Sequence, residues 1–209
     1  PLLYAGLNGV LAALITSIVI LAASIYILNG FSSKTICAII GTSTGIIISG
    51  GLAMIAGSMS HLNGFNMTDV ESMIYIANNS KLHVSDILYA GILISSLGAV
   101  MDVSVSIVAA ITEIHEKAPH LKAKELFMSG MHVGHDMMGT MSNTLILAYT
   151  GSATGTLLTI YSYEMPYLQF MGYNSIIIEI VCGLCGTIGV ILTVPIQAFI
   201  TTMVLKVRK

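Results

Sequence analysis

The sequence has little charge, no tryptophan and only four prolines. Charged residues make up 9% of its 209 positions, whereas about 25% is usual in soluble domains. Hydrophobic residues make up 55%, and the mean hydropathy is +0.89. A chain this short leaves too much of its surface in water to hide so many apolar side chains. The composition therefore excludes a soluble enzyme, a nucleic-acid-binding protein and a disordered chain, and it predicts that lipid surrounds most of the protein.

Familiar catalytic and metal-binding motifs are also missing. The chain has no Walker A lysine motif, no G-x-S-x-G and no H-E-x-x-H. Cys182 and Cys185 have C-x-x-C spacing, but they lie inside an apolar run, so we interpret them as small packing residues. His132 and Asp136 share a helix face, yet zinc needs three or four convergent ligands. We expect no enzyme activity, no cofactor and no metal site.

Five long apolar runs organise the chain. A bilayer core about 30 Å thick needs roughly 20 apolar residues in a helix. Long continuous runs favour helices over the short alternating strands of a barrel. We predict an all-α, polytopic bundle of five transmembrane helices, forming a single domain over residues 1–209. The predicted spans are about 2–28, 36–59, 85–111, 134–161 and 174–205.

The basic residues predict how the bundle is oriented. In a five-helix arrangement, seven of the eight fall on one side, and Lys81 falls on the other. The positive-inside rule then places the C-terminus in the cytoplasm and Pro1 outside. Because the chain starts with Pro1 and not Met, we expect that a segment upstream is missing or has been removed. The seven residues are Lys34, Lys117, Lys122, Lys124, Lys206, Arg208 and Lys209.

Two connecting segments have amphipathic character. The outer segment 60–84 contains Thr68-x-x-Glu71, which has the form of a capping box, followed by apolar residues at helical spacing. The inner segment 112–130 is similar and is interrupted at Pro119. We predict that each forms a short helix on the membrane surface, with a plain connection as the alternative.

Three acids lie inside the predicted spans, where charge is rare and is usually functional. Asp102 shares a helix face with Gly91, Ser95 and Gly98, because these residues are spaced by three or four. Small residues allow a neighbouring helix to approach closely. Removal from water favours the neutral form of a carboxyl group, so we predict Asp102 as an enclosed proton relay. The alternative is an acid that only holds helices together.

The fourth and fifth runs carry matching polar stripes. Asp136 and Glu179 are the further predicted relay acids, near the inner and outer ends respectively, although either could simply reach water there. Hydroxyl and amide groups near them could line a proton path. We predict polar lining by Ser95, His135, Thr140, Asn143 and Thr144. We predict helix packing at Gly41, Gly45, Gly91, Gly98, Gly183 and Gly186.

Segments 97–106 (LGAVMDVSVS) and 129–149 (SGMHVGHDMMGTMSNTLILAY) closely resemble the YibE/F-like family of bacterial multi-pass membrane proteins. Weaker similarity extends to Glu179 and to segment 186–195 (GTIGVILTVP). The resemblance implies a bacterial plasma-membrane protein, in a family described largely as predicted transporters. The family pattern has an arginine where His135 stands, which allows a pH-sensitive pairing with Asp136.

The order of features is also similar, more distantly, to one half of the SecDF/RND transporter membrane domain, in which an intramembrane acid carries proton coupling. This analogy implies a subunit of a proton-coupled transport or export complex, with Asp102 at the matching position. Such halves occur in pairs, so we expect either a related subunit that carries an extracellular domain or a homo-oligomer. The alternative is a scaffold subunit that anchors a surface protein complex without transport.

Overall fold

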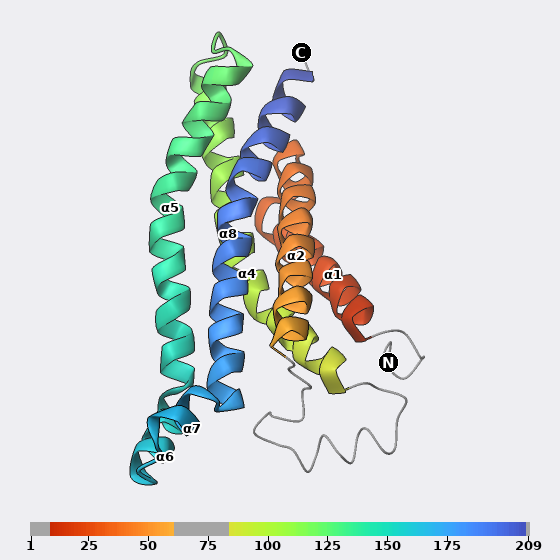
Figure 1. The fold of residues 1–209 in the computed structure, drawn as a ribbon. Coiled ribbons are helices and arrows are strands. Elements are labelled where there is room, and N and C mark those ends of the chain that lie inside the picture. The colour runs from red at the N-terminus through yellow and green to blue at the C-terminus, as the bar shows by residue number, and fades with distance from the viewer. Residues whose placement is uncertain (1–8, 61–83, 208–209) are drawn as a thin grey trace.

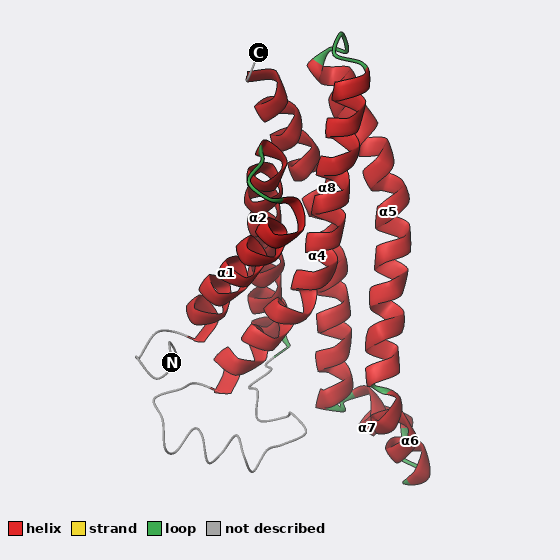
Figure 2. Cartoon of the chain, turned by 180° about the vertical axis from the view of Figure 1, so that it is seen from behind, coloured by secondary structure: helices red, strands yellow, loops and turns green. Residues whose placement is uncertain are grey.

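The computed structural model describes residues 9–60 and 84–207, and every element in these ranges is a helix. Helices α2, α8 and α5 run side by side, α4 passes obliquely behind them, and α1 packs against α2 and α4 (Figure 1). The short helices α6 and α7 lie at one end, beyond the long bundle (Figure 2). The helices are α1 (Gly9–Asn29), α2 (Ser33–Met59), α4 (Val84–Lys117), α5 (Ala123–Ser152), α6 (Thr154–Ser162), α7 (Tyr167–Met171) and α8 (Asn174–Val207).

Four of the described helices, α1, α2, α4 and α8, are long and apolar enough to cross a membrane. They overlap the predicted spans 2–28, 36–59, 85–111 and 174–205. Helix α5 has 30 residues and packs against α4 and α8, but it carries many polar side chains and is not among these four. The all-helical membrane character is therefore confirmed, while the predicted total of five spans stays a prediction.

The predicted boundaries around the fourth span are wrong. Helix α5 begins at Ala123 and not near 134, because the Glu125 carboxylate accepts a hydrogen bond from the Lys122 N–H (2.8 Å) at the helix start. It ends at Ser152, where the Ser152 and Thr154 hydroxyls bond the carbonyls of Tyr149 and Thr150. The chain turns at Ala153 into α6 and does not continue as a single helix to 161.

The predicted inner surface helix over 112–130 is also wrong. Residues 112–117 are the last turns of α4, and the segment from Ala123 onward is the first part of α5. The two helices are joined by a short turn that contains Pro119, which disfavours helical backbone in the residue before it. For the predicted outer segment 60–84, residues 61–83 lie outside the described residues.

Helices α2 and α8 pack through a row of small and polar residues. A β-carbon at Gly41 would overlap the amide of Gln197, and one at Gly45 would overlap the hydroxyl of Thr193. One turn further along, a β-carbon at Gly189 would lie 2.8 Å from the Ser49 β-carbon. The predicted packing roles of Gly41 and Gly45 thus correspond to direct contact between antiparallel helices.

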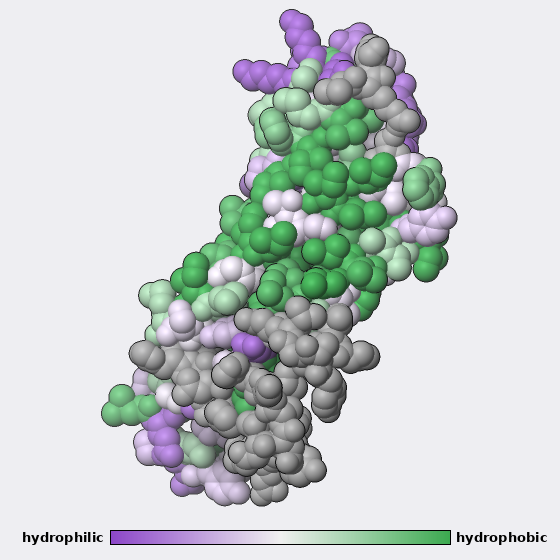
Figure 3. Space-filling view, turned by 90° about the vertical axis from the view of Figure 1, so that its right-hand side faces the viewer, coloured by the Kyte–Doolittle hydropathy of each residue, from purple (hydrophilic) through white to green (hydrophobic). Residues whose placement is uncertain are grey.

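Charged side chains gather at the end of the bundle opposite α6 and α7. Lys34 forms an ion pair with Glu116 (3.2 Å), and the Lys206 ammonium donates a hydrogen bond to the Leu121 carbonyl (2.6 Å). These contacts bring the start of α2 to the end of α4, and the end of α8 to the α4–α5 turn. A broad hydrophobic band crosses the face beside this end (Figure 3). Exposed aliphatic residues of α1, among them Leu11, Val19 and Ile20, belong to the lipid-facing surface of the bundle.

Candidate functional site

Among the described residues, the largest fully buried polar side chain is that of Gln197 on α8. The Ser104 hydroxyl on α4 donates to Gln197 Oε1 (2.8 Å), and Gln197 Nε2 donates to the Cys37 carbonyl on α2 (3.0 Å). Gln197 Nε2 also donates to the Thr201 hydroxyl (3.2 Å). This group, here called the Gln197 node, ties three helices together and has its donors and acceptors paired, as a low-dielectric interior requires.

A second polar contact joins the same three helices, closer to the end that carries α6 and α7. The buried Ser49 hydroxyl on α2 lies 3.2 Å from the Ser96 hydroxyl on α4 and 3.3 Å from the Cys185 carbonyl on α8. The Ser96 hydroxyl in turn donates to the Leu93 carbonyl (3.0 Å). The hydroxyls of Ser49 and Ser96 are therefore both hydrogen-bonded, and they add a second link between α2, α4 and α8.

Asp102 lies on the opposite side of α4, on its exposed face. The same face carries Gly91, Ser95 and Gly98, as the spacing predicts, and all of them are exposed. Gly91 and Gly98 meet open space, since a β-carbon there would find no atom within 4 Å. The expectation that glycine-lined helices of this chain enclose Asp102 is therefore wrong. The acid lies deep along an apolar helix, fifteen residues before Lys117, roughly 22 Å by helix geometry.

Packing contacts fix the relative positions of α4 and α5. A β-carbon at Gly134 would meet Ile107, and the Tyr149 hydroxyl donates to the Ser95 hydroxyl (2.9 Å). Interpolation between these contacts places Asp102 level with Thr140. Asp136 lies about one helical turn nearer the α4–α5 turn than Asp102. Because α5 starts at Ala123, Asp136 is roughly 20 Å into the helix, and so is deeper than expected from a span that begins near 134.

The predicted polar lining of α5 points outward, away from the α4–α5 contact. Thr140 and Thr144 donate their hydroxyls to the carbonyls of Asp136 (3.4 Å) and Thr140 (2.9 Å), and so do not bond Asp102. With their exposed polar neighbours they form what we call the α5 polar face, which spans residues 132–144 of a helix packed beside two apolar ones. Its exposed residues are His132, His135, Asp136, Thr140, Asn143 and Thr144.

Glu179 on α8 is half-buried and borders two pockets on either side of Tyr149. One pocket, about 440 Å³, lies between α4, α5 and α8 and includes Gly91 and Ser95. The other, about 380 Å³, lies between α5 and α8. Both pockets, and Glu179 with them, are near the end that carries α6 and α7. Asp102 lies further from that end, and Asp136 lies one turn further still.

Two predicted packing glycines lie beside this region. A β-carbon at Gly183 would be 3.4 Å from the Tyr149 ring, and one at Gly186 would be 3.6 Å from Leu145. A β-carbon would make only ordinary van der Waals contact at either position, so the packing role of these two glycines stays a prediction. Gly130 and Gly134, which were not predicted as packing residues, make closer contacts, since β-carbons there would overlap Ile111 and Val194. Their spacing of four on α5 was the signal.

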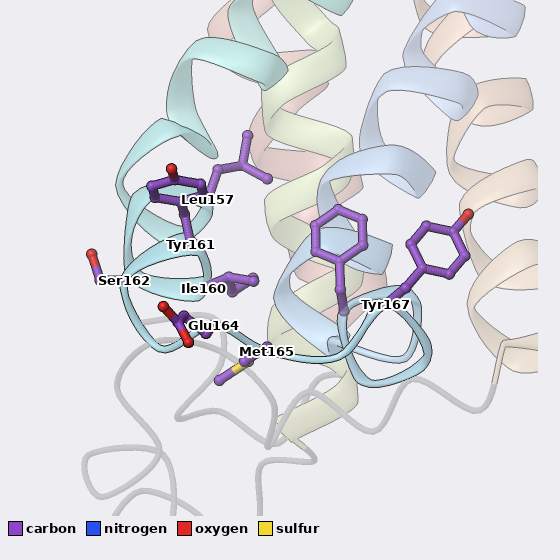
Figure 4. Close-up of a pocket in the computed structure, with 8 residues that line it drawn as sticks. Leu157, Ile160, Tyr161, Ser162, Glu164, Met165 and Tyr167 are labelled. Atoms are coloured by element: carbon purple, nitrogen blue, oxygen red, sulfur yellow. The ribbon is translucent and has the colours of Figure 1, made fainter.

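A further pocket of about 650 Å³ lies at the tip, between α6 and α7. Tyr161 and Tyr167 lie on opposite sides of it, with Glu164 near its edge, so the rings do not enclose a common point (Figure 4). Both tyrosines are strongly exposed. Exposed aromatic rings at the end of an apolar bundle are typical of the membrane–water interface. We interpret α6 and α7 as an interfacial anchor.

Within the described ranges, no three histidine, cysteine, aspartate or glutamate side chains come together as a metal site would require. The three cysteines are free and buried. The residues that sequence reasoning undervalued are Gln197 and Tyr149. Each is a large polar residue inside an apolar run, which was the available signal for an interhelical hydrogen bond.

Long apolar helices, paired polar groups in the core and a polar face on α5 define the chain as a polytopic helical membrane protein. The chain matches the YibE/F-like protein family over residues 1–207, and it belongs to that family. No curated protein matches it. No solved structure matches it either, so the similarity to half of the SecDF/RND membrane domain stays a prediction.

Proposed function

We propose that the chain is an integral membrane subunit of a proton-coupled transport or export complex in a bacterial plasma membrane. Asp102 is the group that takes up and releases the proton. The observation that carries this proposal is the position of an exposed carboxyl group deep along α4, a helix apolar enough to cross the membrane. Intramembrane acids in such positions mark proton relays and ion pathways.

The α5 polar face supports a partner in the membrane. An aspartate at the centre of a membrane helix costs about 2.5–3.5 kcal/mol on insertion scales. Asp102 and Asp136 are both exposed on the isolated chain, so a polar neighbour is favoured over acyl chains. A related subunit that carries an extracellular domain, or a second copy of this chain, would cover the face and complete the polar path. Contact with that partner would then enclose Asp102.

The three acids have a natural order in this scheme. Glu179 is the outer station, Asp102 the central relay and Asp136 the inner station. Asp136 lies one turn closer to the lysine-rich end, which is the end opposite α6 and α7. Protonation neutralises Asp102, which lowers the cost of placing it against an apolar surface. Its helix could then shift against the partner, which couples proton entry to movement of a substrate.

The second candidate is a scaffold subunit that anchors a surface protein complex. The observation that favours it is that the hydroxyls of Thr140 and Thr144 already bond their own helix backbone. A polar face whose hydroxyls are already hydrogen-bonded can pack against another subunit without lining a transport path. In this case the Asp102 side chain only needs to hydrogen-bond, and an amide can replace it.

Asp102→Asn separates the two functions. The complex would be isolated from its native membrane and reconstituted into vesicles, and proton entry would be followed with an enclosed pH-sensitive dye under an imposed potential. We expect Asp102→Asn to abolish proton entry while the complex keeps its composition. Glu113→Gln, which changes an exposed acid at the end of the same helix, is the matched control and should leave proton entry unchanged. Absence of proton entry in the unaltered complex favours the scaffold, and unchanged proton entry with Asp102→Asn rules out Asp102 as the relay.

A further inference from the structure

The pocket between α5 and α8 has the chemistry of a small-molecule site. Its volume of about 380 Å³ lies within the range of roughly 300–1,000 Å³ that is typical of ligand sites. Its wall is mainly aliphatic and includes Ile146, Ile180 and Leu184, while Glu179 is its ionisable carboxyl group. An apolar wall with one charged group selects a ligand by both shape and charge.

Glu179 has no ion-pair partner among the residues that the structure describes. The two threonines of the pocket, Thr150 and Thr187, donate their hydroxyls to the carbonyls of Ile146 and Gly183, each at 2.7 Å. They therefore do not neutralise the carboxylate. A positive charge in the pocket would meet an unpaired negative group in surroundings where electrostatic attraction is stronger than in water.

The depth of Glu179 fits a molecule that enters from the lipid. It lies five residues after the start of α8, roughly 7.5 Å along the helix, near the end that carries the exposed tyrosines. An amphiphilic cation settles at this depth, with its apolar body toward the acyl chains and its charge toward the interface.

We propose that this pocket binds a lipophilic monovalent cation, with the apolar body between α5 and α8 and the positive charge against Glu179. This binding requires no proton transport and no partner subunit, so it stands apart from the function proposed above. The neighbouring pocket, which Glu179 also borders, has a different wall that includes Gly91 and Ser152, so the two pockets can be blocked separately.

The test uses two probes of nearly the same shape and opposite charge, tetraphenylphosphonium and tetraphenylborate. Equilibrium binding of each would be measured on the full chain in lipid nanodiscs, with empty nanodiscs subtracted for partition into lipid. We expect saturable binding of the cation and no saturable binding of the anion. Glu179→Gln should weaken cation binding at least tenfold, whereas Glu164→Gln, outside both pockets, should not change it.

A pair of filling variants locates the site and does not depend on Glu179. Thr150→Phe places a ring in the proposed pocket and should abolish binding, whereas Ser152→Phe fills the neighbouring pocket and should preserve it. Both positions are exposed, so each variant should fold. Equal binding of the two probes, an unchanged affinity in Glu179→Gln, or loss of binding only in Ser152→Phe would overturn the proposal.

Discussion

Gly41 on α2 and Gln197 on α8 are in direct contact, because a β-carbon on Gly41 would overlap the Gln197 amide oxygen. Gly41→Ala forces this amide away from Ser104 and Cys37, so both overpacking and lost hydrogen bonds lower stability. We expect a loss of about 1–3 kcal/mol, read as a lower midpoint of thermal unfolding in detergent. Gly51→Ala on the same helix, where the space is open, is the control and should not destabilise the protein. Equal effects would contradict the close contact.

The Ser104–Gln197 hydrogen bond should be measurable as a coupling energy. A double-mutant cycle with Ser104→Ala and Gln197→Leu isolates their interaction from the rest of the core. Membrane-protein cycles of this kind average about 0.6 kcal/mol and reach about 1.7 kcal/mol. Because both residues are fully buried, we expect a value in the upper half of that range. Strictly additive losses of stability would show that the bond contributes nothing.

The α5 polar face should be covered by another subunit in the native membrane. A single cysteine at Asn143, on an otherwise cysteine-free chain, should crosslink to the partner with a short bifunctional reagent. Val19→Cys on α1, which is more than half exposed among aliphatic residues, should face lipid and give no crosslinked product. Denaturing gels read both results, and the mass of the product distinguishes a second copy from a different subunit. Crosslinking at Val19→Cys and not at Asn143→Cys would show that the partner contacts α1 and not the α5 polar face.

Lys206 should stabilise the α4–α5 turn more than Lys117 stabilises the end of α4. The half-buried Lys206 ammonium donates to the Leu121 carbonyl, and hydrogen bonds with a charged group contribute about 1.5–3 kcal/mol. Lys117 pairs with Glu113 in an exposed position, where ion pairs contribute little. Thermal unfolding should therefore show a lower midpoint for Lys206→Met and no measurable change for Lys117→Met. The reverse order would refute this assignment.

The lysine-rich end should face the cytoplasm. In intact cells, a membrane-impermeant thiol reagent should label a cysteine placed at Tyr163 and should not label one at His120 in the α4–α5 turn. In inside-out vesicles the pattern should reverse. Both residues are exposed, so access depends on the side of the membrane and not on burial. Labelling of His120→Cys in intact cells would mean that the orientation is inverted.

The sequence predicted the helical membrane character and the close approach of helices at two of the six packing glycines, because each leaves a local pattern. Gly41 and Gly45 could be recognised from spacing alone. The direction of the Asp102 face could not, because a stripe of Gly91, Gly98 and Asp102 looks the same whether it faces another helix or the outside. The start of α5 was missed since the polar residues from Ala123 onward hid a helix that hydropathy does not reveal.

The hydrogen bonds of the inner core give the bundle two mechanical parts. The Gln197 node and the Ser49–Ser96 contact fasten α2, α4 and α8 to one another, whereas α5 meets α4 and α8 through Gly130 and Gly134 against aliphatic side chains and through the Tyr149–Ser95 bond. Within the described residues, Tyr149–Ser95 is the side-chain hydrogen bond that joins α5 to α4. A shift of α5 along its axis would therefore leave the hydrogen bonds among α2, α4 and α8 intact and would move Asp136 relative to Asp102.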